Sequence, residues 1–362
     1  MNTDANMSKN KGEWSELYTF CYLLNAGILK TADRNLNPIS SAYLPIIKIL
    51  RKEDDVDKSY SPKSENKCVE IFINNEFKKS VPMKIFEDTV STIYDSMKNE
   101  SLKDADFQIK MQKFMGEIFC TKIKANSSKK EDIVIQIHDI NTNQTPIQGF
   151  SIKSYIGNTP TLLNAAKTTN FIFKVKGCNE SIMDFVNSIK TKKKIFDRMD
   201  YLMKSGCVFE YVSMECECFK KNLQKVDSLM PNIVAEMLLK HYSTGIEKLS
   251  SIAAMLEKED PLRMSNEDYY TYKIKMMLCA FALGMIPSNQ WNGKEDANGG
   301  YIVVKENGDV VCFFLYNRNE FEEYLLNSTK FERPSTGRHE YMTVYKDNND
   351  YFIKLNLQIR FM

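Results

Sequence analysis

The 362-residue chain has few histidines and no excess of charge of either sign. Its three histidines, His138, His241 and His339, are far apart in the sequence, which disfavours mechanisms that need several of them. The 49 Lys and Arg residues nearly balance the 47 Asp and Glu residues. The overall charge therefore does not indicate a nucleic-acid partner, and any such surface must be local.

The nine cysteines form no metal-binding pattern. The close pair Cys216 and Cys218 has one residue between them, whereas a structural zinc site uses gaps of about two to four residues. An odd, unpatterned set predicts reduced thiols in a cytoplasmic protein. The polar N-terminus lacks the apolar core of a signal peptide, and the apolar run near Met276–Met285 is too short to span a membrane.

The sequence predicts helices and strands at the start of the chain, helices in the middle, and both again at the end. Apolar residues at three- and four-residue steps predict a helix over Glu13–Leu29. Alternation predicts two strands, 133–138 and 147–156, joined by a turn over Asn141–Thr145. We expect an α/β fold in three parts, which are a core over 1–180, a helical region over 181–290 and a mixed part over 291–362.

Several shorter segments also have simple patterns. The charged stretch 52–66 predicts a loop, and Thr161–Lys167 predicts one or two helical turns. The Asn-Gly pair at 307–308 predicts a hairpin. Alternation over Tyr351–Phe361 predicts one final strand.

The segment from Asp132 to Lys153 carries the strongest candidate site. If its turn centres near residue 142, Asp132 lies roughly opposite Ser151, and Ser151 and Lys153 face the same side of their strand. Phosphodiester hydrolysis needs carboxylates that hold a hard cation such as Mg²⁺, and a lysine that favours hydroxide and the anionic transition state. Asp132, Ser151, Lys153 and the carbonyl of Ile152 are therefore candidate catalytic or metal-binding groups. Asp139 is the alternative acid, although Asp is common near turns for local reasons.

An acid followed by Ser-x-Lys on the adjacent strand resembles the PD-(D/E)XK nuclease motif. Glu131 stands where that motif has proline, and Ser151 stands where it has a second acid. The first predicted helix can supply the missing carboxylate from Glu16, with Glu13 as the reserve. Residues 11–16, KGEWSE, are similar to the N-terminal helix signature of several nucleases of this fold, including archaeal Holliday-junction resolvases.

Five segments together resemble the HpaII family of type II restriction endonucleases. They are NKGEWSELY (10–18), GFSIKSYIGNTPTLLNA (149–165), TNFIF (169–173), FERPSTGRHEY (331–341) and YFIKLNLQIRF (351–361). The resemblance includes both ends and the middle of the chain.

The resemblance implies a bacterial, Mg²⁺-dependent endonuclease that hydrolyses double-stranded DNA at a short specific sequence and leaves 5′-phosphate ends. Its fold would be PD-(D/E)XK-like, with a central mixed sheet flanked by helices. A cognate DNA methyltransferase would be encoded nearby. A palindromic target would require a homodimer.

The C-terminal loop Lys330–His339 is the first candidate for DNA contact. Arginine is well shaped for the major-groove edge of guanine, and two arginines flank a short polar stretch here. An ordinary polar surface loop is the alternative. The candidate residues are Arg333, Ser335, Thr336, Arg338 and His339.

Two other positions are candidates for DNA contact. Lys193 belongs to a basic run that either anchors phosphates or forms a solvated surface. Asn164 follows the strand of the candidate lysine and either contacts DNA or caps its own helix.

Two functions other than sequence-specific cleavage stay open at this point. One is a structure-selective repair nuclease of the same fold. The other is a DNA-binding protein with a decayed nuclease core, which the serine at position 151 favours.

Overall fold

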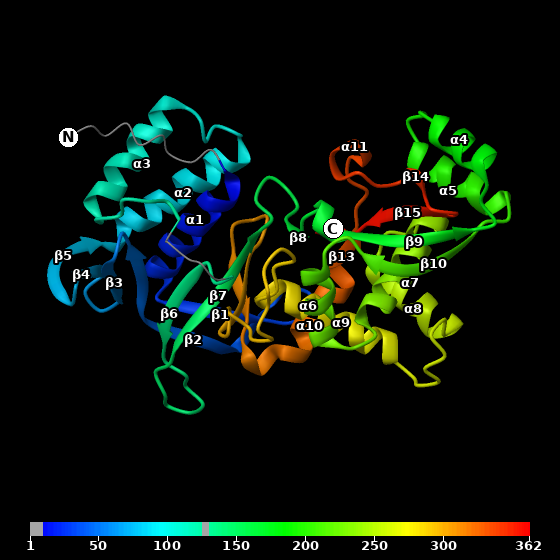
Figure 1. Ribbon diagram of the computed structural model, residues 1–362. Coiled ribbons are helices and arrows are strands. Elements are labelled where there is room, and N and C mark those ends of the chain that lie inside the picture. The colour runs from blue at the N-terminus through cyan, green and yellow to red at the C-terminus, as the bar shows by residue number, and fades with distance from the viewer. Residues whose placement is uncertain (1–9, 125–129) are drawn as a thin grey trace. The chain divides into compact units, whose positions relative to one another are not determined.

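The chain forms two compact units (Figure 1). The structure is a computed structural model that describes residues 10–124 and 130–362. Unit 1 consists of 1–160 and 295–321, and unit 2 consists of 161–294 and 322–362. The chain therefore leaves unit 1 after residue 160 and returns to it for residues 295–321, a grouping that differs from the three consecutive parts expected above.

Unit 1 contains a nine-stranded sheet with the order β1-β12-β11-β7-β6-β2-β3-β4-β5. Most neighbours are antiparallel, but β7 pairs in parallel with β11, and β1 pairs in parallel with β12. The sheet is therefore mixed, and β7 lies inside it rather than at an edge. The strands are β1 (Ile28–Ala32), β2 (Pro38–Glu53), β3 (Val56–Lys63), β4 (Cys68–Ile73), β5 (Glu76–Pro82), β6 (Ile133–Ile137), β7 (Ile147–Ser154), β11 (Gly300–Val304) and β12 (Val310–Phe313).

Three helices belong to unit 1, namely α1 (Lys11–Ala26), α2 (Met83–Lys98) and α3 (Ala105–Glu117). The first, α1, packs against α2 and against strands β1, β2, β3 and β7. Trp14 is fully buried and meets Phe107 edge to face, with ring centroids 4.8 Å apart. The helix begins after Asn10, whose side chain accepts from the Gly12 N–H, and it ends at Gly27, which adopts φ 68°. The predicted first helix is confirmed, except that it ends earlier because Gly27 turns the chain into β1.

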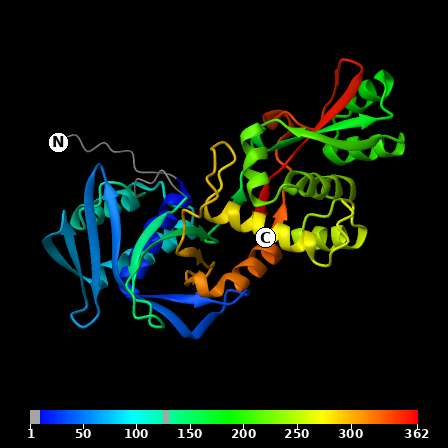
Figure 2. The same ribbon diagram turned by 60° about the horizontal axis from the view of Figure 1, so that its bottom comes forward.

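Unit 2 contains two small sheets and most of the helices. The first sheet has the order β10-β9-β15-β14, and the second has the order β13-β16-β8. Figure 2 shows the last strands of the chain beside β9 and β10, in agreement with the antiparallel pairing of β15 with β9. The strands are β8 (Thr161–Leu163), β9 (Asn170–Lys176), β10 (Val208–Met214), β13 (Thr329–Phe331), β14 (Val344–Asp347), β15 (Asp350–Asn356) and β16 (Ile359–Phe361).

The helices of unit 2 pack around these sheets. Helix α7 contacts α5, α6, α8 and α9, and it also contacts β10. No helix in the described part of the chain is long and apolar enough to cross a membrane. The remaining helices are α4 (Glu180–Ser188), α5 (Lys194–Lys204), α6 (Glu217–Val226), α7 (Met230–Thr244), α8 (Leu249–Glu259), α9 (Tyr269–Leu283), α10 (Arg318–Ser328), which begins in unit 1, and α11 (Thr336–His339), with short 3-10 turns at Lys167–Thr169 and Leu315–Asn317.

Several predictions from the sequence were wrong. The stretch 52–66 is not a loop. It contains the end of β2, the β2–β3 turn, the whole of β3 and the start of the following turn, and its charges pair within the sheet, as Lys58 does with Glu53. Residues 161–167 form strand β8 and the start of a 3-10 turn, since β8 pairs with β16. The helical middle contains strand β10, and the final strand is interrupted where the Leu357 N–H donates to the Thr169 carbonyl.

Candidate active site

Asp132 directly precedes β6 and lies beside Ser151 of β7. Ile133 pairs with Phe150, so the register predicted from the sequence is the observed one. The Asp132 N–H donates to the Phe150 carbonyl at 2.8 Å. Its carboxylate oxygen Oδ2 accepts from the Ile152 N–H at 2.8 Å and from the Ser151 hydroxyl at 3.2 Å. One oxygen of Asp132 is therefore fixed by β7, and the other, Oδ1, faces away from these donors.

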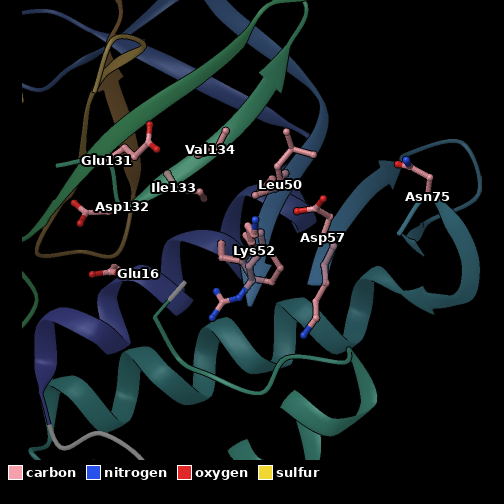
Figure 3. A pocket seen from close by; sticks show the side chains of 13 residues that line it. Glu16, Leu50, Lys52, Asp57, Asn75, Glu131, Asp132, Ile133 and Val134 are labelled. Carbon is pink, nitrogen blue, oxygen red and sulfur yellow. The ribbon is translucent and has the colours of Figure 1, made fainter. Parts of the chain in front are cut away.

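Helix α1 brings Glu16 to the same place. The Lys124 ammonium lies 3.1 Å from Glu16 Oε1 and 3.6 Å from Asp132 Oδ1, so one cation joins the two acids. Glu16 and Asp132 lie near each other at one end of a cavity (Figure 3). Glu16 Oε2 is buried and has no hydrogen-bond partner within the described ranges.

Glu16 and Asp132 lie close together and are mostly buried, which affects the pKa values at this site. Burial, and then the Asp132 charge, raise the pKa of Glu16 to about 7, while Lys124 and Arg51 act in the opposite direction. Burial lowers the pKa of Lys153, and the charges of Asp132 and Glu16 oppose that shift. The three groups are therefore close enough to affect one another.

Two lysines at this site were not singled out from the sequence. Lys124 joins the acids, and burial together with the charge of Lys153 lowers the pKa of Lys130 to about 8. Both belong to the lysine-rich stretch 122–130, which directly precedes the strand of Asp132. That proximity was the only available signal, because the contact with Glu16 is long-range.

The cavity beside the acids is about 470 Å³ in volume. Besides Glu16, Glu131 and Asp132, its lining includes charged side chains from β2 and β3, namely Arg51, Lys52, Asp57 and Lys58. Arg51 and Lys58 are buried and both form ion pairs with Glu53. Burial acts to raise the pKa of Glu53, but these two cations and the Thr121 N–H outweigh it and lower that pKa to about 2.

The donor set fits one divalent cation. Carboxylates are the preferred ligands of hard cations. Glu16 and Asp132 each have an oxygen that is not committed to the protein backbone. In the part of the chain that the structure covers, no three His, Cys, Asp or Glu side chains are arranged so that they could hold a metal ion together, so a cation here would rely on these two acids. The remaining positions would have to be filled by a carbonyl, water or phosphate.

The alternative acids lie elsewhere. Asp139 is in the turn beyond β6, where its carboxylate accepts from Tyr316 at 2.5 Å, from Thr142 at 2.8 Å and from the Asn141 N–H at 3.0 Å. These bonds make it a turn-stabilising residue. Glu13, one turn before Glu16 on α1, is not among the described residues that line the cavity.

The candidate DNA-contacting residues come together in unit 2, around two cavities that share Arg333, Pro334 and Ser335. One cavity, of about 610 Å³, lies between the Lys192–Phe196 segment and the C-terminal loop. The other, of about 430 Å³, lies between that loop and Asn164. The candidates that line them are Asn164, Lys193, Arg333, Ser335, Thr336, Arg338 and His339.

Buried contacts hold the C-terminal loop in place. The Tyr341 hydroxyl donates to the Pro334 carbonyl at 2.8 Å, and Asn170 donates to the His339 carbonyl at 2.9 Å. Arg333 lies 3.5 Å from Glu247, whereas the Arg338 side chain is exposed. Asn164 follows β8 and caps no helix, because the next helical turn begins at Lys167 with Ala166 before it.

The raised pKa of Glu16 predicts a pH dependence of stability. Glu16 binds its proton more tightly in the folded chain than in the unfolded chain, so metal-free protein should lose stability as the pH rises from about 4.5 to 7. The loss attributable to Glu16 is on the order of 3 kcal/mol and is complete above that range.

Urea unfolding in the presence of a chelator, across this pH range, measures the effect. Glu16→Gln should remove this pH-dependent loss. The free energy of unfolding of the variant should therefore increase relative to that of the wild type as the pH rises. A difference between the two proteins that does not change with pH would contradict the assignment.

Comparison with known proteins identifies the family. The model of the HpaII restriction endonuclease family matches residues 10–361. The type II restriction enzyme HpaII of Haemophilus parainfluenzae is 38% identical over 358 residues, which are 98% of this chain and 99% of that enzyme. No solved structure matches the chain. The resemblance seen in the five segments is thus confirmed over nearly the whole length, and the chain belongs to the HpaII restriction endonuclease family.

Proposed function

We propose that this restriction endonuclease is Mg²⁺-dependent and cleaves double-stranded DNA at a short specific sequence with Glu16, Asp132 and Lys153 as its central groups. The observation that carries the proposal is the ammonium of Lys124 between Glu16 and Asp132, because it marks a place where two acids from distant segments require a cation. Lys153 is electrostatically coupled to both acids.

Asp132 and Glu16 would hold the metal. Ser151 and the Ile152 N–H orient Asp132 through Oδ2, which leaves Oδ1 for the cation. In a strand, the N–H and the carbonyl of one residue point to the same side. The Ile152 carbonyl therefore also faces the Asp132 side and is a candidate third ligand. When bound, the metal neutralises phosphate charge and lowers the pKa of a coordinated water.

Lys153 acts on the proton of the attacking water and on the charge of the transition state. Its lowered pKa makes its neutral form more accessible than that of an exposed lysine, and its ammonium form stabilises the pentacovalent phosphate. Attack by water with loss of the 3′-oxygen leaves a 5′-phosphate. The sheet with β7 inside it and α1 packed against it supports a PD-(D/E)XK-like core in which Glu16 replaces the acid absent at Ser151.

Unit 2 would provide the DNA-reading groups. Arg333 and Arg338 are suited to guanine, and Ser335, Thr336 and His339 add donors beside them. Lys193 is suited to phosphate, and Asn164 lies on the same lining as Arg338. A cognate DNA methyltransferase would protect the host, and a palindromic target would be read by a homodimer.

The second candidate function is a DNA-binding protein with a decayed nuclease core. Ser151 favours it, because a serine replaces an acid of the motif. Glu16 argues against it, since a second carboxylate is present at the site and is held there by a buried helix face.

The first prediction from this proposal concerns Lys153. Lys153→Ala should reduce plasmid cleavage with Mg²⁺ by at least about 100-fold, because proton transfer and charge stabilisation are lost together. DNA binding, measured by mobility shift with Ca²⁺, should stay close to that of the wild type.

Lys305→Ala is a matched control, because Lys305 is a lysine of the same unit whose ammonium faces Asp309 in the β11–β12 turn. The control should cut normally. Discrete fragments from the wild type support site-specific cleavage, and normal cutting by Lys153→Ala would mean that the catalytic lysine is a different one.

The second prediction separates base reading from phosphate anchoring. Arg338→Ala should cost roughly 1–3 kcal/mol of binding to the recognised sequence and should relax discrimination at one base pair. Lys193→Ala should weaken binding to all sequences and reduce the slope of affinity against salt by about one unit.

Lys258→Ala, on the exposed side of α8, is the control and should change neither quantity. Equal behaviour of the Arg338, Lys193 and Lys258 variants in fluorescence-anisotropy titrations would place the DNA surface outside these cavities.

A further inference from the structure

We propose that Lys124 holds the two carboxylates of the site together in the metal-free enzyme and that a divalent cation must displace its ammonium in order to bind. The inference rests on the proposed function, since it assigns metal binding to Glu16 and Asp132. It makes Lys124 a positioning residue that sets the metal affinity.

The geometry places the ammonium where the cation would have to be. Lys124 Nζ contacts Glu16 Oε1 and Asp132 Oδ1, and Oδ1 is the oxygen that Ser151 and Ile152 leave uncommitted. Magnesium binds carboxylate oxygens at about 2.0–2.1 Å. The ammonium lies 3.1 Å from Glu16 Oε1 and 3.6 Å from Asp132 Oδ1, which leaves no room for an ion that binds these two oxygens at that distance. The two cations therefore compete for one position.

The charges favour the ammonium in the metal-free state. The side chains of Glu16 and Asp132 are only 12% and 18% exposed, so their mutual repulsion is poorly screened. The Lys124 ammonium lies within ion-pair distance of both acids and therefore offsets part of this repulsion.

A buried ion cluster holds the segment that carries Lys124. Arg51, which pairs with Glu53, donates to the carbonyls of Lys122 and Ile123, the latter at 2.9 Å. Glu53 also accepts from the Thr121 N–H at 2.8 Å and from its hydroxyl at 2.7 Å.

Two further bonds hold the residues just before this point. Lys58 donates to the Phe119 carbonyl at 2.7 Å, and the Tyr60 hydroxyl donates to the Ile118 carbonyl at 3.1 Å. The backbone is therefore fixed up to the residue before Lys124. The ammonium can leave the acids by rotation of its own side chain, without unfolding of the segment.

Removal of the Lys124 ammonium should lower the stability of the metal-free protein and raise its affinity for a metal. Removal of the ammonium leaves the two acids without their counter-charge, which destabilises the metal-free fold. Without the ammonium, a cation can bind without first breaking the ion pairs of Lys124 with Glu16 and Asp132, so metal binding becomes stronger. A purely structural lysine would produce the first effect without the second.

The test is a titration of the full chain with Ca²⁺, without DNA, at one fixed pH for all variants. Calorimetry and the shift of the melting temperature both report the binding. Lys124→Met keeps the length of the side chain and removes its charge, and it should bind Ca²⁺ roughly 10-fold more tightly than the wild type while melting at a lower temperature without metal. Lys124→Arg should restore both values toward those of the wild type.

Lys122→Met is the matched control, because Lys122 lies two residues away and pairs with Asp54 instead of the site acids. It should leave the Ca²⁺ affinity unchanged. If Lys124→Met fails to fold, Lys124→Gln serves for the same comparison.

Two outcomes would overturn the inference, and they are distinguishable. In the first outcome, Lys124→Met binds Ca²⁺ no more tightly than the wild type, while Asp132→Asn no longer binds it. This result would contradict the role of Lys124 and leave the proposed metal site intact. Absence of binding in the wild type and in every variant would remove the metal site itself, and the inference with it.

Discussion

Two carboxylates that are close together and partly shielded from water repel each other unless a cation lies beside them. Glu16 and Asp132 are in this situation, and much of unit 1 is arranged around it. The buried side of α1 fixes where Glu16 points, while the backbone and Ser151 of β7 fix one oxygen of Asp132. Lys124 then supplies the positive charge.

The cation that joins the acids depends on a second, more deeply buried set of charges. Arg51, Glu53 and Lys58 pair inside the fold and use their remaining donors and acceptors to hold the segment 119–123. A buried charge is tolerated when all of its partners are present, so this cluster specifies one position for the segment rather than several. The position of Lys124 at the candidate site therefore depends on buried residues beside the site.

Part of this site was predictable from the sequence and part was not. The register that places Asp132 opposite Ser151 follows from alternation and a short turn, both of which are local. Glu16 was proposed because the hairpin lacked an acid and because residues 11–16 resemble the N-terminal helix signature of several nucleases. Lys124 could not be reached in this way, because its contact with Glu16 depends on how residues 118–123 are held by β2 and β3.

The fold shows the same division between local and distant information. Helix α1 and strands β6 and β7 were predicted near their observed bounds. The β2–β3 hairpin was missed because charges that neutralise each other inside a sheet look like a solvated loop in the sequence. Strand β8 was missed because its partner, β16, lies at the other end of the chain. The grouping of 295–321 with the first 160 residues also depends on contacts that no local pattern records.

The parallel pairing of β7 with β11 has a consequence for when the enzyme becomes complete. In the order of synthesis, β11 follows the whole of residues 161–294, yet its Tyr301 and Ile302 lie beside Ser151 and Ile152 of the strand that carries Lys153. Until the ribosome has passed residue 304, β7 has an open edge and the sheet stops there. A chain that is released before residue 300 therefore lacks the strand that pairs with β7 on that side of the nine-stranded sheet.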